Sequence, residues 1–313
     1  MNTTTTKPDI SLLVPVFNEA ENIDHLLARL NSVIDKLSLQ VEYVFVNDGS
    51  SDNTLHLLLS AQKNDKRIAI LDLSRNFGKE AALTAALDFC RGRAAIPIDA
   101  DLQDPPEILP ELIAKWNDGY EVVNAVRRSR REEGFAKRFT AFLFYRFIGR
   151  LSETPIPPDT GDFRLLSRPV IEALKRMPER RRFMKGIFAW VGFKTAEIYY
   201  DRPARIAGST SWNYFKLANF AIEGLTSFSA KPLRWATYLG ILTALTSFVY
   251  AIVIVLKTLL WGEPVAGYPS LMVVMLFLGS VQLVSIGIIG EYLGRVYEET
   301  KQRPVYLTKA IYE

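Results

Sequence analysis

The chain has 313 residues, 49% of them hydrophobic and 23% charged, with a formal net charge of +4. This length accommodates one large globular domain plus a membrane part. A single cysteine excludes an internal disulfide and a cysteine-based metal site. No zinc-finger spacing or RNA-binding signature accompanies the basic residues, so we expect lipid and phosphate partners and no nucleic acid. Residues 1–8 are polar and contain no apolar signal-peptide stretch, so we expect the N-terminal domain to stay in the cytoplasm.

Residues 9–126 alternate between short apolar stretches and helical patterns, which predicts an α/β domain with a mostly parallel, Rossmann-like sheet. Pro97 lies inside the fourth expected strand. Because proline cannot donate a ladder hydrogen bond, it argues against a central position, and we expect it where no donor is needed. The expected strands are Ile10–Val16, Val41–Val46, Ile68–Leu73, Ala94–Ile98 and Glu121–Val126, and the expected helices are Glu19–Leu37, Asp52–Asn64 and Lys79–Arg91.

Two carboxylates, Asp99 and Asp101, follow the fourth expected strand. Side chains two apart on a strand point to the same face, so we expect these carboxylates to project together. Hard oxygen donors at the end of a strand suit Mg²⁺ or Mn²⁺ beside a phosphorylated ligand. The sequence therefore predicts a metal and nucleotide site after this strand.

Two further strand ends, near residues 15–19 and 48–50, belong to the same expected edge, because ligands of open α/β sheets bind outside the carboxyl ends of strands. Asp48 can accept a hydrogen bond from a pyrimidine ring N–H, and Gly49 lets the backbone approach the base. The alternative for this turn is a helix N-cap, which we assign to Asp52. No Gly-x-Gly-x-x-Gly or Walker motif occurs, which argues against dinucleotide and ATP sites.

The sequence pattern of the C-terminal third predicts association with a membrane. Residues 212–234 mix aromatic and basic side chains, typical of an interfacial helix, the alternative being a buried amphipathic helix. The uncharged stretches 235–256 and 268–290 each suffice to cross a hydrocarbon core of roughly 30 Å. Basic residues, including Lys309, flank the outer ends, so the positive-inside rule places both ends in the cytoplasm. Gly290 and Gly294 permit close helix approach, in a homo-oligomer or against the first span.

Four ordered motifs carry a resemblance to a known family: Leu13–Glu19, Val46–Thr54, Ser74–Lys79 and Asp99–Glu107. They resemble the inverting family 2 glycosyltransferases of GT-A fold, and most closely the polyprenyl-phosphate glycosyltransferases. The resemblance covers residues 9–211, and the hairpin is similar to the bacterial membrane-anchored branch. It implies a cytoplasmic GT-A domain (1–211), an interfacial helix (212–234), a transmembrane hairpin (235–294) and a cytoplasmic tail (295–313), in a multi-pass protein of the bacterial inner membrane.

The resemblance also implies residue roles. Arg127 and Arg138 would grip the acceptor phosphate, and Asp159 or Asp162 would face the donor sugar, with the choice left open. Ser211 stands where the family's loop after Arg205 usually has lysine, which puts that loop's phosphate contact in doubt. The metal, Mg²⁺ or Mn²⁺, would be held by Asp99, Asp101 and Gln103, with Asp101 also catalytic. The donor would be surrounded by Pro15, Phe17, Asn18, Glu19, Asp48, Ser50, Lys79, Asp99 and Arg205.

The implied reaction transfers a sugar, in the first instance glucose from UDP-glucose, to undecaprenyl phosphate with inversion. Asp48 favours UDP over GDP, and a modified sugar such as aminoarabinose is an alternative donor group. A processive polysaccharide synthase needs more spans and a Gln-x-x-Arg-Trp signature, whereas Lys231–Trp235 lacks the glutamine. A non-catalytic nucleotide-sugar sensor would have no reason to keep both carboxylates and the basic segment.

Overall fold

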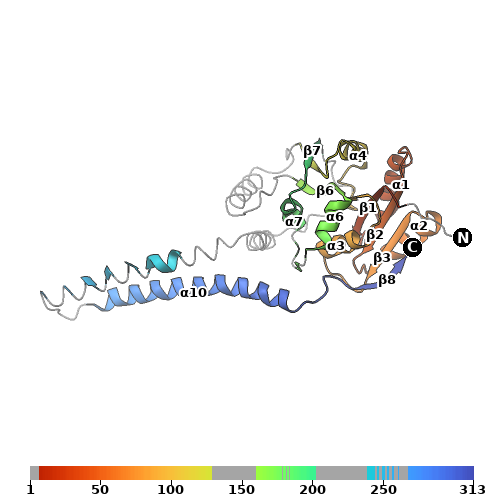
Figure 1. Cartoon of the computed structure of the whole chain (residues 1–313). Helices are drawn as coiled ribbons and strands as arrows, with labels where there is room; N and C mark the ends of the chain where they lie inside the picture. The colour runs from red at the N-terminus through yellow and green to blue at the C-terminus, as the bar shows by residue number, and fades with distance from the viewer. Residues whose placement is uncertain are drawn as a thin grey trace. The chain divides into compact units, whose positions relative to one another are not determined.

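The computed structural model describes residues 7–128, 160–201 except 178, 181 and 183, and 238–313 except 244, 247–248, 251, 254–255, 257–259 and 261–266. The chain divides into two compact units, Met1–Ala221 with Pro304–Glu313, and Ile222–Arg303. The first unit holds the sheet and the second contains the long helix α10 (Tyr268–Thr300) (Figure 1).

The first unit is built on an eight-stranded sheet with the order β7-β5-β6-β4-β1-β2-β3-β8. Strand β6 is antiparallel to β4 and β5, and β8 is antiparallel to β3, while the other pairings are parallel. The prediction of a mostly parallel sheet is confirmed. The strands are β1 (Ile10–Val16), β2 (Val41–Asn47), β3 (Ile68–Leu73), β4 (Ala94–Pro97), β5 (Val122–Arg127), β6 (Thr160–Ser167), β7 (Thr195–Tyr200) and β8 (Thr308–Tyr312).

The position of Pro97 in the sheet contradicts one expectation and supports another. Strand β4 lies inside the sheet, between β6 and β1, so the argument against a central position was wrong. The N–H of Ile98 donates to Leu13 O of β1 (2.9 Å), so the nitrogen of Pro97 faces the β6 side. Pairing with β6 extends only over Ala94 and Ala95. The proline thus stands where the ladder needs no donor.

Helices cover both faces of this sheet. Helices α1, α2 and α4 supply leucines and isoleucines to one buried cluster, whose strand residues include Ile10, Leu12, Tyr43 and Phe45. Helices α3 and α6 pack against each other and against the sheet, and α7 packs against β6; all three lie outside that cluster. The helices are α1 (Ile23–Ile34), α2 (Thr54–Asn64), α3 (Lys79–Phe89), the 3₁₀ turn η1 (Pro106–Ile108), α4 (Leu109–Asn117), α6 (Arg168–Lys175) and α7 (Met184–Trp190).

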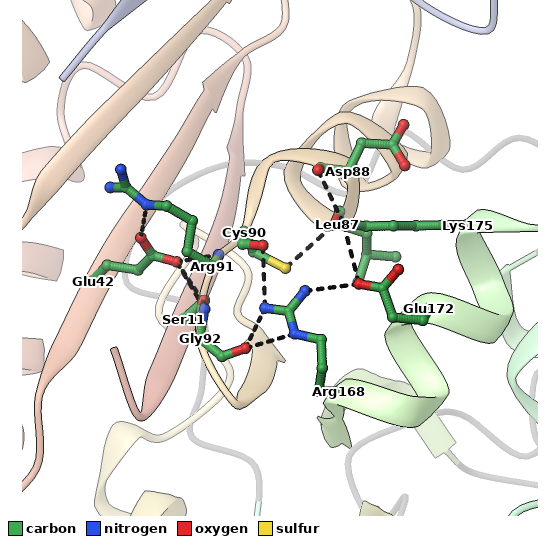
Figure 2. A network of polar contacts seen from close by, with 10 residues as sticks. All are labelled: Ser11, Glu42, Leu87, Asp88, Cys90, Arg91, Gly92, Arg168, Glu172 and Lys175. Carbon is green, nitrogen blue, oxygen red and sulfur yellow. Dashed lines mark hydrogen bonds and ion pairs between the residues drawn. The ribbon is translucent and has the colours of Figure 1, made fainter. Parts of the chain in front are cut away.

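A buried polar network ties the edge of the sheet where β1, β2 and β4 begin (Figure 2). The Glu42 carboxylate is 4% exposed and accepts from the Ser11 hydroxyl (2.5 Å) and from the N–H (2.6 Å) and Nε (3.0 Å) of Arg91. Arg168 of α6 donates to the carbonyl oxygens of Cys90 and Gly92. A Cβ at Gly92 would lie 2.5 Å from Ser11 Oγ, so only glycine fits here. These contacts fasten α6 to the turn between α3 and β4.

In the second unit, α10 runs ten residues beyond the expected span, to Thr300. Within the described residues, one helical stretch, Phe277–Thr300, is long and apolar enough to cross a membrane. The first expected span, 235–256, is described only in fragments, and the interfacial segment 212–234 lies outside the described residues.

The last ten residues belong to the first unit, not to the unit that contains α10. Strand β8 pairs with β3 at the end of the sheet, as Figure 1 shows. The tail, which we expected only as a cytoplasmic extension, therefore completes the sheet.

Candidate active site

A lysine and two aspartates meet where the parallel strands end. Lys79 Nζ, at the start of α3, lies 2.6 Å from Asp99 Oδ1 and 2.9 Å from Asp162 Oδ2. Burial lowers the pKa of Lys79, but the two carboxylates more than offset this and raise it above its ordinary value, so the ammonium stays charged. Three residues predicted from separate motifs thus form one cluster.

The direction of β6 explains how Asp162 reaches this cluster. Because β6 runs antiparallel to β4 and β5, its first residues lie at the edge where those strands end. Behind Asp162, the Arg164 guanidinium is buried, stacks 4.3 Å from the Phe188 ring centre and donates to Gly161 O (2.7 Å). Burial lowers the pKa of Arg164 to about 10, although Asp162 opposes this shift. Asp162 is therefore flanked by two cations.

Asp99 and Asp101 lie in a turn rather than on a strand. Strand β4 ends at Pro97, and Leu102 has a φ of 59°, so the alternation argument for this pair was wrong. Asp101 Oδ1 accepts the N–H of Gln103 (3.1 Å). Arg29 of α1 braces this turn through a hydrogen bond to Leu102 O (3.4 Å), and it also makes two 2.8 Å hydrogen bonds to Glu107 of η1. The pair is held by this turn and its brace.

Hydrogen bonds join the loops that follow β1 and β2. The N–H of Asn18 donates to Ser50 Oγ (3.0 Å), and Asn18 Oδ1 accepts the N–H of Ser51 (2.8 Å). The N-cap of α2 is Asn53 rather than Asp52. Asp52 instead accepts from the N–H of Thr54 (3.0 Å) and from that of Ala20 (3.2 Å), joining the two loops. Phe17, in the loop after β1, is 45% exposed.

Asp48 fixes a third loop, the one between β3 and α3. Its oxygens accept the N–H groups of Phe77 (2.7 Å) and Gly78 (2.9 Å), just before Lys79. Burial raises the pKa of the Asp48 carboxyl and these two donors lower it, with a net increase. Gly49 has a φ of 66°, and a Cβ there would lie 2.4 Å from the Arg75 carbonyl carbon, so only glycine allows this approach. Whether Asp48 also contacts a base remains a prediction.

Arg127 ends β5 on the same side and belongs to a buried polar group with Tyr200 and Asp104. The Tyr200 hydroxyl donates to Asp104 Oδ1 (3.2 Å), and burial together with that carboxylate raises the pKa of Tyr200 to about 12. Burial lowers the pKa of Arg127, but Tyr200 and the carboxylates of Asp104 and Asp99 raise it by more, so the net shift is upward. Sequence reasoning missed Tyr200, because the weakly apolar β7 was not recognised.

The structure describes only some of the other residues predicted for the site. Pro15 and Glu19 lie at and just beyond the end of β1, with the N–H of Glu19 bonded to Thr54 Oγ1 (2.9 Å). Asp159, Arg138 and Arg205 lie outside the described residues, so their assignments stay predictions.

The donor set fits a divalent cation that is only partly held by protein. Within the described ranges, no group of three or more His, Cys, Asp or Glu side chains is placed as a metal site. Asp99 and Asp101 with the Gln103 amide offer oxygen ligands of the kind that Mg²⁺ and Mn²⁺ prefer, and Mg²⁺ commonly completes its shell with phosphates and water. These residues therefore suit a cation shared with a bound diphosphate.

Comparison with known proteins gives consistent matches. The family model described as glycosyl transferase family 2 matches residues 11–175, and that of the GtrB C-terminal hairpin matches residues 231–296. The chain is 53% identical over 304 residues to an uncharacterized glycosyltransferase, sll0501, of Synechocystis sp., covering 97% of this chain and 96% of the relative. It is 49% identical over 302 residues to the prophage bactoprenol glucosyl transferase homolog of Escherichia coli, covering 96% and 99%.

A crystal structure of glucosyl-3-phosphoglycerate synthase from Mycobacterium tuberculosis, in complex with Mn²⁺, uridine diphosphate and phosphoglyceric acid, matches with a TM-score of 0.46 at 17% identity, over 70% of this chain and 76% of that one. The hairpin match together with α10 indicates membrane association. With one family model over half of its length and relatives near half identity over almost all of it, the chain belongs to glycosyltransferase family 2 and is a glycosyltransferase of GT-A fold.

Proposed function

We propose that this chain transfers glucose from UDP-glucose to undecaprenyl phosphate, with inversion at the anomeric carbon. The observation that carries the proposal is the cluster of Lys79, Asp99 and Asp162 at the carboxyl edge, with Arg127 close enough to act electrostatically on Asp99. The name of the Escherichia coli relative supports both the sugar and the lipid acceptor.

The donor would lie across the three loops that follow β1, β2 and β3, which hydrogen bonds join to one another. The exposed Phe17 ring offers a surface for the uracil. Asp48, whose oxygens also accept the N–H groups of Phe77 and Gly78, would add a contact to the ring N–H of the uracil. Lys79 would lie beside the diphosphate. Asp162 would face the sugar, where a carboxylate steadies the positive charge that develops on the ring.

A divalent cation held by Asp99, Asp101 and Gln103 would offset the charge of the departing diphosphate, as a Lewis acid does. Arg127, and Arg138 in the predicted acceptor site, would position the lipid phosphate through charge-assisted hydrogen bonds. This phosphate is largely dianionic at pH 7, so no general base is required. Its oxygen forms a bond to the anomeric carbon as the bond from that carbon to UDP breaks, and UDP leaves.

We further propose that the hairpin spans the bacterial inner membrane twice and keeps the catalytic unit in the cytoplasm, where nucleotide sugars are made. An isoprenoid chain could then stay in the bilayer while its phosphate reaches the site. The small residues of α10 also favour a homo-oligomer, with packing against the first span as the alternative.

The direct test is to incubate the purified full-length protein with undecaprenyl phosphate and a panel of UDP- and GDP-sugars, and to identify the lipid product by mass. Glucosyl-phosphoryl-undecaprenol formed from UDP-glucose, with the opposite anomeric configuration, is expected. Polymer formation would favour a polysaccharide synthase, and nucleotide binding without UDP release would favour a sensor.

A further inference from the structure

The end of the chain is built into the sheet next to the loops of the donor site. Strand β8 pairs antiparallel with β3, from Ile70 opposite Tyr312 to Leu73 opposite Thr308. Just above this pairing, the N–H of Ser74 donates to Leu307 O (2.9 Å). Ser74 opens the loop that runs to Lys79, so the tail contacts that loop where it leaves the sheet.

Lys309 sits at an irregularity in this pairing. Ala310 lies opposite Asp72 and Thr308 opposite Leu73, so two residues of β8 share one position of β3. A bulge of this kind redirects the side chain it carries. Lys309 Nζ lies 3.5 Å from Asp72 Oδ2, and the Asp72 side chain is only 4% exposed, whereas that of Lys309 is 67% exposed. The tail thus brings a cation to a buried carboxylate.

Hydrogen bonds lead from Asp72 to the nucleoside loops. Asp72 Oδ1 accepts from Asn47 Nδ2 (2.7 Å), and Asn47 Oδ1 accepts from the N–H of Ser50 (3.3 Å). Ser50 Oγ in turn accepts the N–H of Asn18. Through Ser74 the tail also contacts the loop whose N–H groups hold Asp48. Two routes therefore run from β8 to the donor loops.

We propose that Lys309 is a positioning residue for the nucleotide donor: its ammonium compensates the buried Asp72 carboxylate, which orients the Asn47 amide and, through it, the loop at Ser50. Without the ammonium, a buried carboxylate carries more uncompensated charge, and its neighbours shift to relieve it. Sequence reasoning counted Lys309 only among the positive charges that flank the hairpin. The identity of the ligand as a uridine nucleotide rests on the proposed function.

The experiment compares full-length Lys309→Met and Lys309→Arg with wild type and with Glu313→Gln. Glu313 Oε1 contacts Arg91 (3.6 Å) at the other end of β8, so its variant is a matched control for docking of the strand. The measurements are the affinity for UDP by calorimetry, the KM values for UDP-glucose and lipid phosphate, and kcat.

Lys309→Met should raise the Kd for UDP and the KM for UDP-glucose about three- to tenfold, the size of one lost hydrogen-bond-scale contact, with the KM for lipid phosphate unchanged. Lys309→Arg should restore most of the affinity, and Glu313→Gln should change neither value. Asp72→Asn, which changes the other partner of the ion pair, should raise the Kd for UDP and the KM for UDP-glucose by the same factor as Lys309→Met, again with the KM for lipid phosphate unchanged.

Unchanged UDP affinity in both Lys309→Met and Asp72→Asn, or equal increases in both KM values, would overturn the proposal. These results are separable from failure of the proposed function. A wild type that binds UDP but makes no glucosyl lipid contradicts the assigned reaction and leaves the UDP comparison intact, while a wild type that makes the lipid with an insensitive Lys309 contradicts only the positioning role.

Discussion

The two edges of the central sheet carry similar charged residues arranged for opposite purposes. Where the strands begin, the Glu42 carboxylate is buried and accepts hydrogen bonds from Ser11, Arg91 and Gly92. Where they end, the Asp99 side chain is 30% exposed and Lys79 is 45% exposed, although the two form an ion pair. One edge uses its charges to fix a turn, and the other presents them to solvent, where a ligand can reach them.

An ion pair between charged side chains does not by itself mark a functional site. Arg91 and Glu42 are paired as well as Lys79 and Asp99, yet only the second pair lies where parallel strands end and loops converge. Variants at the two edges should therefore separate activity from stability.

The largest effect is expected at Asp101. Asp101→Asn removes one anionic oxygen ligand without changing volume, so transfer should fall by about a hundredfold or more, while the melting temperature stays near that of wild type. Initial rates in metal-buffered solution, with thermal melts alongside, measure both. Wild-type turnover in Asp101→Asn would contradict the metal assignment.

A smaller effect is expected for the acceptor side. Arg127→Gln should raise the KM for lipid phosphate by roughly ten- to a hundredfold, the loss of about 1.5–3 kcal/mol from one charged contact, with the KM for UDP-glucose little changed. Tyr200→Phe, which removes the hydroxyl beside Arg127 but leaves the ring, should shift the same KM by less. Parallel increases in both KM values would show that Arg127 does not form the acceptor site.

At the opposite edge, Glu42→Gln should reduce the free energy of unfolding by about 1.5–3 kcal/mol, because a buried charge-assisted network loses its anion. The kcat and both KM values of the remaining folded protein should match wild type. Chemical denaturation combined with the transfer assay checks this, and a selective loss of turnover at full stability would remove the distinction between the two edges.

The smallest signal is expected from Cys90, the only cysteine. It is 3% exposed, and burial raises its pKa to about 11, so near neutral pH it should react hardly at all with a thiol reagent. Wild type can therefore serve as the background for a topology test. A cysteine replacing Gly267 should be labelled from outside intact cells by an impermeant reagent, and one replacing Thr300 only after the membrane is opened. Labelling at Thr300 in intact cells would reverse the proposed orientation.

The sequence predicts the first half of the sheet well, because Ile10–Val16 and Ile68–Leu73 are apolar, short and bounded by turn residues, and both are strands with these bounds. It does not reveal β6, since Thr160–Ser167 includes the buried charge of Arg164, nor β8, whose five residues include an exposed lysine. These omissions affect the site directly. The position of Asp162 depends on the antiparallel course of β6, and the contact between Lys309 and Asp72 depends on a pairing between residues far apart in the chain.

Calorimetric titration of UDP with and without Mn²⁺ shows whether the carboxyl edge binds a nucleoside diphosphate together with a divalent cation. The cation should strengthen UDP binding to wild type and to Glu42→Gln by the same factor, and should have little effect on Asp101→Asn. If Asp101→Asn gains as much affinity from Mn²⁺ as wild type does, Asp101 is not a ligand of the cation and the cation is not held at this edge.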